Sequence, residues 1–312
     1  MDKIQAWLDT TPYKGFGISP ASADASFRKY YRITSGGISY LLMDSSLEKH
    51  SLAPFLDVTA RLLKIGVHAP DILEQNLAEG YLIIKDFGNT HYLNLLHSGN
   101  FTELYSRAIE QILLMQKAST ADLPLYDRAF LHMEMDLMQE WYLQKLLDKK
   151  LSDTQLQILD ISLKSISDVV LSQPQNVFVH RDFHSRNIML TPADEIGVID
   201  YQDAMNGALT YDLVSLLKDC YIEFQREDIL RLVLEFRDKK GVDADDETFI
   251  KWFDFMGLQR HIKVLGVFSR LYLRDAKEGY LKDIPLTLKY LLDTASLYDE
   301  TKELAKLLKE LQ

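Results

Sequence analysis

The sequence predicts an α+β protein with two lobes, a small β-rich N-lobe over residues 1–88 and a larger helical C-lobe over residues 89–312. Short apolar runs separated by turn residues are concentrated in the first part of the chain. From about residue 94 onward, apolar residues instead recur three and four positions apart, which is the helical period. Between the two patterns lies the polar, glycine-containing stretch 85–89, which we interpret as the linker between lobes.

The N-terminal pattern predicts strands, which fall at 16–18, 30–33, 40–43, 70–73 and 81–84. Gly36-Gly37 predicts a hairpin, and the last two strands are expected to pair across residues 76–80. A short helix over 3–9 comes first, and a helix over 51–65, ended by Gly66, interrupts the strands.

The rest of the chain predicts helices, at 101–118, 130–147, 153–171, 210–224, 226–238, 247–274 and 285–309. Pro124 and Pro174 fall between these segments, as helix breakers should.

The composition of the chain argues against nucleic-acid binding, membrane insertion and an internal disulfide. Apolar residues make up 47% of the 312 and charged residues 26%, the balance of a soluble globular protein with a full core. The net charge of -11 argues against nucleic acid as a partner. No apolar stretch is long enough to cross a bilayer, and Cys220, the single cysteine, cannot form an internal disulfide. We therefore expect a cytoplasmic protein without membrane insertion.

The stretch from Val177 to Asp203 carries the clearest chemical signal. Asp182 and Asn187 are five positions apart in a polar turn, and Asp200 follows at the end of a second apolar strand. Phosphoryl transfer from ATP needs this set, because one carboxylate accepts the proton of the attacking hydroxyl while an amide and a second carboxylate hold Mg²⁺. We assign Asp182 as the catalytic base and Asn187 and Asp200 as metal ligands, and we expect the flanking runs 176–179 and 188–190 to pair as strands.

Two other interpretations of this stretch exist. His180, Asp182 and His184 alternate and would share one face of a strand, as ligands of a metal hydrolase could. The histidines could also satisfy backbone groups inside a core. Spacing favours phosphoryl transfer, because a three-ligand strand leaves Asn187 and Asp200 without a role.

Candidates for nucleotide binding lie in the N-lobe. The small residues of 22–27, including Ser26 and Phe27, could form a phosphate-covering loop or a plain surface turn. Asp86-Phe87-Gly88 matches the metal-binding triplet of protein kinases by letter, but it precedes the catalytic turn instead of following it. We interpret it as the linker, with Lys85 and Asp86 as nucleotide-binding candidates.

At these motifs the sequence resembles the aminoglycoside phosphotransferase-like kinases, whose catalytic loop reads His-x-Asp-x-x-x-x-Asn and whose metal aspartate lies in an Ile-Asp-aromatic strand. His180 to Asn187 and Ile199-Asp200-Tyr201 match both. The segments 24–32, 210–221 and 258–266 further resemble the bacterial N-acetylmuramate/N-acetylglucosamine 1-kinases of cell-wall recycling. This resemblance implies a kinase-like bilobal fold and ATP-dependent phosphorylation, with Mg²⁺, of the anomeric hydroxyl of an amino sugar.

The sequence departs from the general kinase pattern at one strand. Residues 40–44 carry no lysine for the α- and β-phosphates, so Arg28 and Arg32 are our candidates for this contact. The helix 51–65 lacks a Glu, for which Asp57 is a short substitute.

A sugar pocket needs hydrogen-bonding groups on a stiff wall. Our candidates for this role are His184, Gln202, Asp203, Arg260 and Arg274, and Arg260 or Arg274 could clamp the lactyl carboxylate of N-acetylmuramate. Two alternatives stay open. One is a kinase of another hydroxylated molecule such as a cationic aminoglycoside, which would need a dense acidic cluster facing Asp182. Asp243, Asp245 and Asp246 are acidic, but we interpret them as a surface connector. The other alternative is a nucleotide-binding pseudokinase module.

Overall fold

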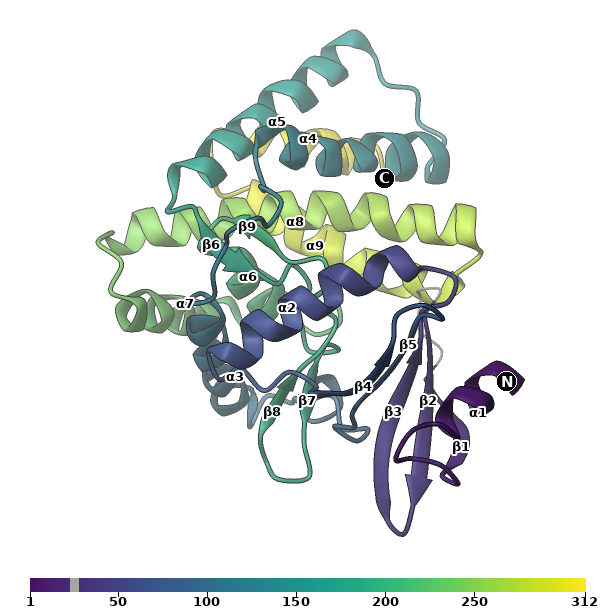
Figure 1. The fold of residues 1–312 in the computed structure, drawn as a ribbon. Coiled ribbons are helices and arrows are strands. Elements are labelled where there is room, and N and C mark those ends of the chain that lie inside the picture. Colours follow the sequence, from purple (N-terminus) through teal and green to yellow (C-terminus); the bar gives the residue numbers. More distant parts are fainter. Residues whose placement is uncertain (23–27) are drawn as a thin grey trace. The chain divides into compact units, whose positions relative to one another are not determined.

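A computed structural model describes residues 1–22 and 28–312, so the candidates Ser26 and Phe27 lie outside the described residues. The described chain forms two compact units, which are presented separately. The first unit comprises Met1–Tyr92 with Asn187–Asp203, and the second comprises Leu93–Arg186 with Ala204–Gln312. The first is built on an antiparallel sheet and the second is mainly helical, which confirms the predicted α+β class (Figure 1).

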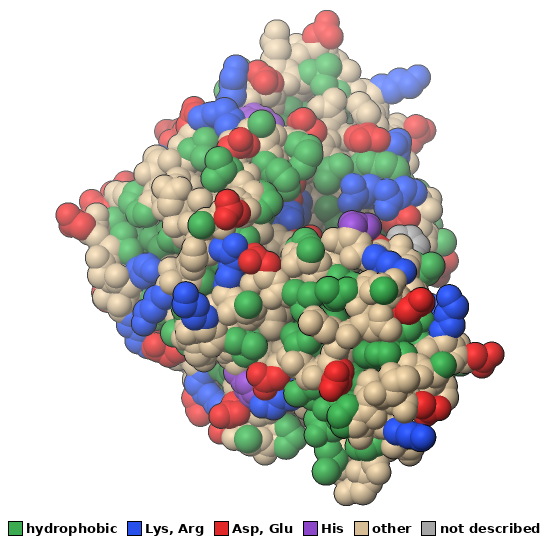
Figure 2. Space-filling model, viewed as in Figure 1, with side chains coloured by type: hydrophobic (Ala, Val, Ile, Leu, Met, Phe, Trp, Pro, Cys, Tyr) green, Lys and Arg blue, Asp and Glu red, His purple; other side chains and the backbone are tan. Residues whose placement is uncertain are grey.

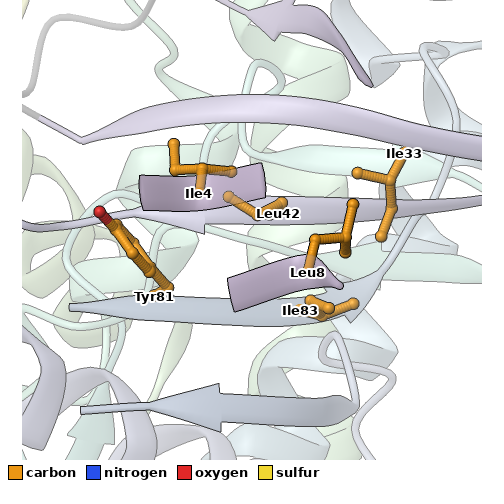
Figure 3. Packing of buried hydrophobic residues seen from close by; sticks show 6 residues of the cluster. All are labelled: Ile4, Leu8, Ile33, Leu42, Tyr81 and Ile83. Atoms are coloured by element: carbon orange, nitrogen blue, oxygen red, sulfur yellow. The ribbon is translucent and has the colours of Figure 1, made fainter. Parts of the chain in front are cut away.

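The first unit contains a five-stranded antiparallel sheet in the order β1-β2-β3-β5-β4. Its strands are β1 (Gly17–Ser22), β2 (Lys29–Ser35), β3 (Ile38–Asp44), β4 (Ile72–Asn76) and β5 (Tyr81–Lys85). Gly36 and Gly37 both have positive φ, as the tight β2–β3 turn requires, so the predicted hairpin is confirmed. Helix α1 (Asp2–Leu8) places Ile4 and Leu8 against the sheet residues Ile33, Leu42, Tyr81 and Ile83 (Figure 3).

Helix α2 (Leu52–Lys64), preceded by a 3-10 turn over Lys49–Ser51, is tied to the residue that follows Asp200. Phe55 stacks on Tyr201 with ring centroids 5.3 Å apart, and the Tyr201 hydroxyl lies 2.8 Å from Thr59 Oγ1. The end of the predicted metal-binding strand is thereby fixed by buried contacts.

The predicted pairing of 176–179 with 188–190 is wrong. Strand β6 (Val177–Val179) pairs with β9 (Met205–Gly207), whereas β7 (Ile188–Leu190) pairs with β8 (Ile196–Val198). The short connection from 191 to 195 makes β7–β8 a local hairpin, closed by a bond from Thr191 N to Glu195 O of 2.9 Å.

The β7–β8 hairpin belongs to the first unit, although the sequence places it far beyond the expected lobe boundary at residues 88 and 89. Val198 N donates to His68 O at 3.0 Å, and Leu190 N donates to Thr90 O at 2.8 Å. Gly197 also leaves no room for a side chain, because a Cβ there would lie 2.4 Å from the Phe87 ring. Backbone bonds and close packing therefore group Asn187–Asp203 with the N-terminal residues.

The second unit is built around the long, largely buried helix α8 (Asp246–Asp275). It packs against α4 (Arg128–Leu137), α5 (Asp153–Ser172), α6 (Tyr211–Leu217), α7 (Arg226–Lys240) and α9 (Ile284–Ala295), and it runs alongside α4 and α9 in Figure 1. The other elements are 3-10 helices over Tyr92–Asn94 (at the boundary of the units) and Glu278–Asp283, α3 (Phe101–Met115), a π-helix over Met138–Leu146 and α10 (Lys302–Glu310).

Three of the predicted helices differ from the observed ones. The helix expected over 210–224 ends at Leu217, because Lys218 leaves the helical conformation and the Asp219 carboxylate takes up the backbone N–H of Tyr221. The helix expected over 285–309 is divided into α9 and α10, and 130–147 changes from an α-helix to a π-helix.

Acidic and basic side chains are interspersed on the face of the chain shown in Figure 2. In the described parts of the chain, no helix has the length and apolar character needed to span a bilayer.

Candidate functional site

Asp212 of α6 fixes the loop that carries Asp182 through hydrogen bonds to the loop backbone. The buried Asp212 carboxylate accepts the backbone N–H groups of His180 and Arg181, at 2.8 and 3.0 Å. Arg181 has φ +77°, a conformation that non-glycine residues rarely adopt without compensating contacts. These two bonds supply such contacts, so the backbone immediately before Asp182 is fixed.

A second buried carboxylate, Asp219, holds the other end of the loop. It accepts the backbone N–H of Ser185 at 2.9 Å, the Ser185 hydroxyl, and the backbone N–H of Tyr221 at 3.0 Å. Burial raises the pKa of Asp219 to about 6. The sequence alone does not assign these roles to Asp212 and Asp219. Their signal is two acidic residues within an apolar run, because buried carboxylates require partners.

Asp182 lies among cations of α8. Arg260 Nη1 is 3.7 Å from Asp182 Oδ1 and donates to the carbonyl oxygen of Arg181 at 2.8 Å. Burial raises the pKa of Asp182, but Lys263 and Arg260 outweigh it and hold that pKa well below its usual value. The Asp182 side chain is nevertheless 39% exposed. It is therefore ionised at neutral pH and open to an acceptor hydroxyl.

Glu134 of α4 connects these cations to the loop. It is buried, and it accepts from Lys263 Nζ at 3.2 Å, Gln259 Nε2 at 3.3 Å, the Arg181 guanidinium and the Tyr126 hydroxyl. Burial raises the pKa of Glu134, but Lys263 and Arg181 lower it more. Its charge offsets Lys263 and Arg181, and no sequence motif identifies this role.

The two histidines of the loop differ. His180 is fully buried, and its Nδ1 accepts the backbone N–H of Asp182 at 3.3 Å, so it supports the loop from within. His184 is partly exposed and meets the Tyr221 ring edge-on, with centroids 5.3 Å apart. Burial lowers the pKa of His184 to about 3, so its imidazole is neutral at physiological pH.

In the first unit, the β7–β8 hairpin brings Asn187 and Asp200 together. Asn187 Nδ2 donates to Asp200 Oδ2 at 3.2 Å, and Gln202 Nε2 donates to Asp200 Oδ1 at 2.9 Å. Asp200 is exposed and has φ +65°, which turns its carboxylate out of the strand direction. Gln202 therefore orients Asp200, and the neighbouring Asp203 is exposed.

Amide and carboxylate oxygens are the hard ligands that Mg²⁺ prefers, so the donor set of Asn187 and Asp200 fits this ion. No group of three or more His, Cys, Asp or Glu side chains able to hold a metal exists within residues 1–22 and 28–312. A magnesium site does not require one, because Mg²⁺ typically binds one or two carboxylates together with substrate phosphates and water.

Arg32, one of the two cations predicted to contact phosphate, is engaged by the linker. It donates to both carboxylate oxygens of Asp86, at 2.6 and 3.1 Å, to Gly88 O at 3.2 Å and to Asn89 Oδ1 at 2.9 Å. Burial raises the pKa of Asp86, but the bond to Arg32 lowers it below its usual value. The charge of Arg32 is therefore compensated, and this pair secures the linker to β2.

Arg28 and Lys85 have different surroundings. Arg28 follows the undescribed residues 23–27, is buried, and donates to Ser51 Oγ and Ser51 O at 3.3 Å each. Lys85 Nζ lies 3.1 Å from His68 Nε2 and 3.9 Å from Asp71. Asp57 forms an ion pair with Arg61 of its own helix.

Of the two arginines predicted to clamp a carboxylate, only Arg260 lies at Asp182. Arg274 is 57% exposed and pairs with Asp275. It follows Arg260 by 14 residues on α8, which corresponds to about 21 Å along the helix axis. The acidic connector is also occupied, since Asp245 caps α8 through Thr248 N at 2.8 Å and Asp246 pairs with Arg237.

Comparison with known proteins identifies the family of the chain. The family described as "Phosphotransferase enzyme family" matches residues 17–244, which is more than half of the chain. The chain belongs to this family. An N-acetylmuramate/N-acetylglucosamine kinase of Neisseria meningitidis is 40% identical, covering 99% of this chain and 95% of that protein. A Pseudomonas aeruginosa protein of the same name is 37% identical, covering 98% of this chain and 91% of its own length.

Solved structures of other kinases and phosphotransferases share the fold at much lower identity. An ADP-bound aminoglycoside phosphotransferase, APH(2'')-Ib, is 15% identical with a TM-score of 0.63, covering 94% of this chain and 98% of its own. An ethanolamine kinase of Plasmodium vivax is 13% identical with a TM-score of 0.66, covering 96% and 87%. These likenesses establish the kinase-like fold.

Proposed function

We propose that this phosphotransferase moves the γ-phosphoryl group of ATP to the anomeric hydroxyl of N-acetylmuramate or N-acetylglucosamine. The observation that carries this proposal is the 40% identity to an N-acetylmuramate/N-acetylglucosamine kinase over almost the full length of both chains. The ionised, partly exposed Asp182 supports it, because phosphoryl transfer to a hydroxyl requires a carboxylate of this kind.

In the proposed reaction Asp182 accepts a hydrogen bond from the acceptor hydroxyl and takes its proton as the phosphoryl group transfers. A carboxylate with a low pKa is a weak base, so its main contribution is to orient the hydroxyl oxygen. Asp212, Asp219 and Arg260 keep the loop and the carboxylate in place for this task.

Asn187 and Asp200 would hold Mg²⁺, oriented by Gln202. When bound, this ion neutralises negative charge on the phosphates. On the nucleotide side, the Arg32 guanidinium is bound to Asp86, and we keep Arg28 as a candidate for a phosphate contact and Lys85 and the linker as candidates for contact with the purine. We keep residues 1–88 and 89–312 as the proposed nucleotide-covering and substrate-binding lobes.

A cationic aminoglycoside is a weaker candidate acceptor. It would require a dense acidic surface facing Asp182, whereas the groups that most lower the pKa of Asp182 are the cations Lys263 and Arg260. We further propose that the reaction serves the recycling of cell-wall sugars in the cytoplasm, which the likeness to the N-acetylmuramate/N-acetylglucosamine kinases supports.

The test is a screen of the purified chain with Mg-ATP and a panel of sugars, measuring ADP release and the position of the new phosphate. We expect turnover of N-acetylated amino sugars with loss of the reducing end. A phosphorylated product that keeps its reducing end would refute transfer to the anomeric hydroxyl. Binding of Mg-ATP without turnover of any amino sugar would favour a pseudokinase.

A further inference from the structure

The predicted catalytic loop, residues 180–187, exposes several polar side chains to solvent. Asp182, His184 and Arg186 are partly exposed, whereas Phe183 and Ser185 between them are fully buried and hold the loop to the second unit. The exposed parts of His184 and Arg186 are therefore candidates to contact an acceptor whose reacting hydroxyl lies at Asp182.

Arg186 is held in place by two neighbours from other elements. Its guanidinium carbon lies 3.5 Å from the centroid of the Tyr221 ring, close enough for a cation–π contact. Its Nη2 lies 3.7 Å from Asp283 Oδ2, an ion pair longer than a hydrogen bond. The Arg186 side chain is still 37% exposed. A stacked arginine presents its N–H donors in one plane, which suits a directed contact at the edge of the guanidinium.

Asp283 is a buried carboxylate with an incompletely satisfied oxygen. Its side chain is 10% exposed, and Oδ2 accepts no hydrogen bond from any residue that the structure describes. Burial of such a group is costly without compensating charge, and the Arg186 guanidinium supplies that charge. Asp283 is therefore suited to orient Arg186.

Charge around the loop does not select for an anionic acceptor. The cations described there are Arg181, Arg186, Arg260 and Lys263. They are balanced by the carboxyl groups of Glu134, Asp182, Asp212, Asp219 and Asp283. A cluster without excess positive charge favours a neutral hydrogen-bond acceptor such as an amide carbonyl.

We propose that Arg186 recognises the acetamido group of the acceptor sugar by donating to its carbonyl oxygen, with Asp283 as a positioning residue. This inference rests on the proposed function. In an N-acetylhexosamine the acetamido group is on the carbon next to the anomeric carbon. It must therefore lie close to the base, and Arg186 follows Asp182 by four residues in the same loop.

The test compares kcat and KM for N-acetylglucosamine, N-acetylmuramate and glucose, which lacks the acetamido group. The variants are Arg186→Gln, Arg186→Lys and Asp283→Asn. The matched control is Arg231→Gln, which removes another arginine paired with an aspartate, Asp228, on the exposed surface of α7. Thermal melting checks that each variant is folded. If Arg186→Gln does not fold, the activity of Arg186→Lys on the three sugars tests the inference instead.

We expect Arg186→Gln to lower kcat/KM for both N-acetylated sugars by roughly 10- to 100-fold, the loss typical of a hydrogen bond to a charged group. Turnover of glucose should stay within about twofold, because glucose makes no contact that the variant removes. Arg186→Lys should recover little, since it lacks the stacked fork. Asp283→Asn should raise KM for the N-acetylated sugars with a smaller change in kcat.

Several outcomes would overturn the inference. An equal loss with glucose and N-acetylglucosamine would make Arg186 a support of the loop only. A loss confined to N-acetylmuramate, recovered by Arg186→Lys, would mean that Arg186 reads the lactyl carboxylate. An active parent enzyme with unchanged variants defeats this inference alone, whereas a parent inactive on every N-acetylated sugar defeats the proposed function with it.

Discussion

Single carboxyl groups around one loop have opposite titration behaviour because their partners differ. Asp182 faces cations that hold its pKa low, whereas Asp219 accepts mainly from neutral backbone and hydroxyl donors, so burial raises its pKa to about 6. His184 is neutral at working pH, because burial lowers its pKa to about 3. Asp219 therefore changes its charge closer to neutral pH than Asp182 or His184 does.

We predict that Asp219 makes the protein less stable as pH rises from about 4 to about 6. The folded chain holds this proton up to about pH 6, but the unfolded chain releases it near the ordinary pKa of 3.8. The contribution of Asp219 to stability is therefore fully present below pH 3.8 and is lost as pH rises through 6. The loss is about 3 kcal/mol, from about 1.4 kcal/mol per pKa unit.

Urea denaturation at pH values from 4 to 7 measures this effect. Asp219→Asn cannot titrate, so the stability difference between the parent and this variant should shift by that amount across the range. Asp160→Asn, an exposed aspartate of α5, serves as the control and should keep a constant difference. Parallel profiles for the parent and Asp219→Asn would contradict the prediction.

At the scale of elements, α8 organises the second unit because it approaches its neighbours closely. A Cβ at Gly266 would lie 2.3 Å from the carbonyl carbon of Leu137 and 2.6 Å from its oxygen, where α4 ends and the π-helix begins. The glycine thus allows contact between backbones, and the same helix carries Arg260 and Lys263, the cations that lower the pKa of Asp182.

We predict that Gly266→Ala lowers the free energy of unfolding by about 3 kcal/mol, because backbone atoms cannot give way as a flexible side chain can. The better helix propensity of alanine offsets at most about 1 kcal/mol of this. The control is Gly279→Ala, where a Cβ would meet no atom within 4 Å. Chemical denaturation measures both variants, and equal stabilities would show that the two helices can separate at no cost.

Elements with a strong local signal were predictable, and those decided by distant partners were not. The Gly36-Gly37 hairpin and the helical period of α3, α5, α7 and α8 are properties of neighbouring residues. The partner of a three-residue strand is a tertiary property, which is why the pairing expected for 176–179 is wrong. The bond between Arg32 and Asp86 joins residues 54 positions apart, so the spacing of motifs could not reveal it.

At the scale of the whole molecule, the residues predicted for catalysis belong to different compact units. Asp182 is in the second unit, and Asn187 and Asp200 are in the first, although the hairpin follows the loop directly in sequence. Each unit holds its own residues through internal bonds, Asp212 and Asp219 for the loop and Gln202 for Asp200. This division implies that nucleotide binding and acceptor chemistry can be impaired separately.

We predict that Asp182→Asn lowers kcat by roughly 10²- to 10⁴-fold, because the amide neither accepts the proton nor orients the hydroxyl as the carboxylate does, and leaves Mg-ATP affinity unchanged. Asp200→Asn should instead weaken Mg-ATP binding at least about tenfold and abolish turnover, because it removes a charged oxygen ligand, yet leave sugar affinity unchanged. Calorimetric titration with each ligand separates the two effects.

Asp194→Asn, an exposed aspartate at the tip of the same hairpin with φ +59°, is the matched control and should behave like the parent. If Asp182→Asn weakened Mg-ATP binding as much as Asp200→Asn does, the two units would not divide the chemistry in this way.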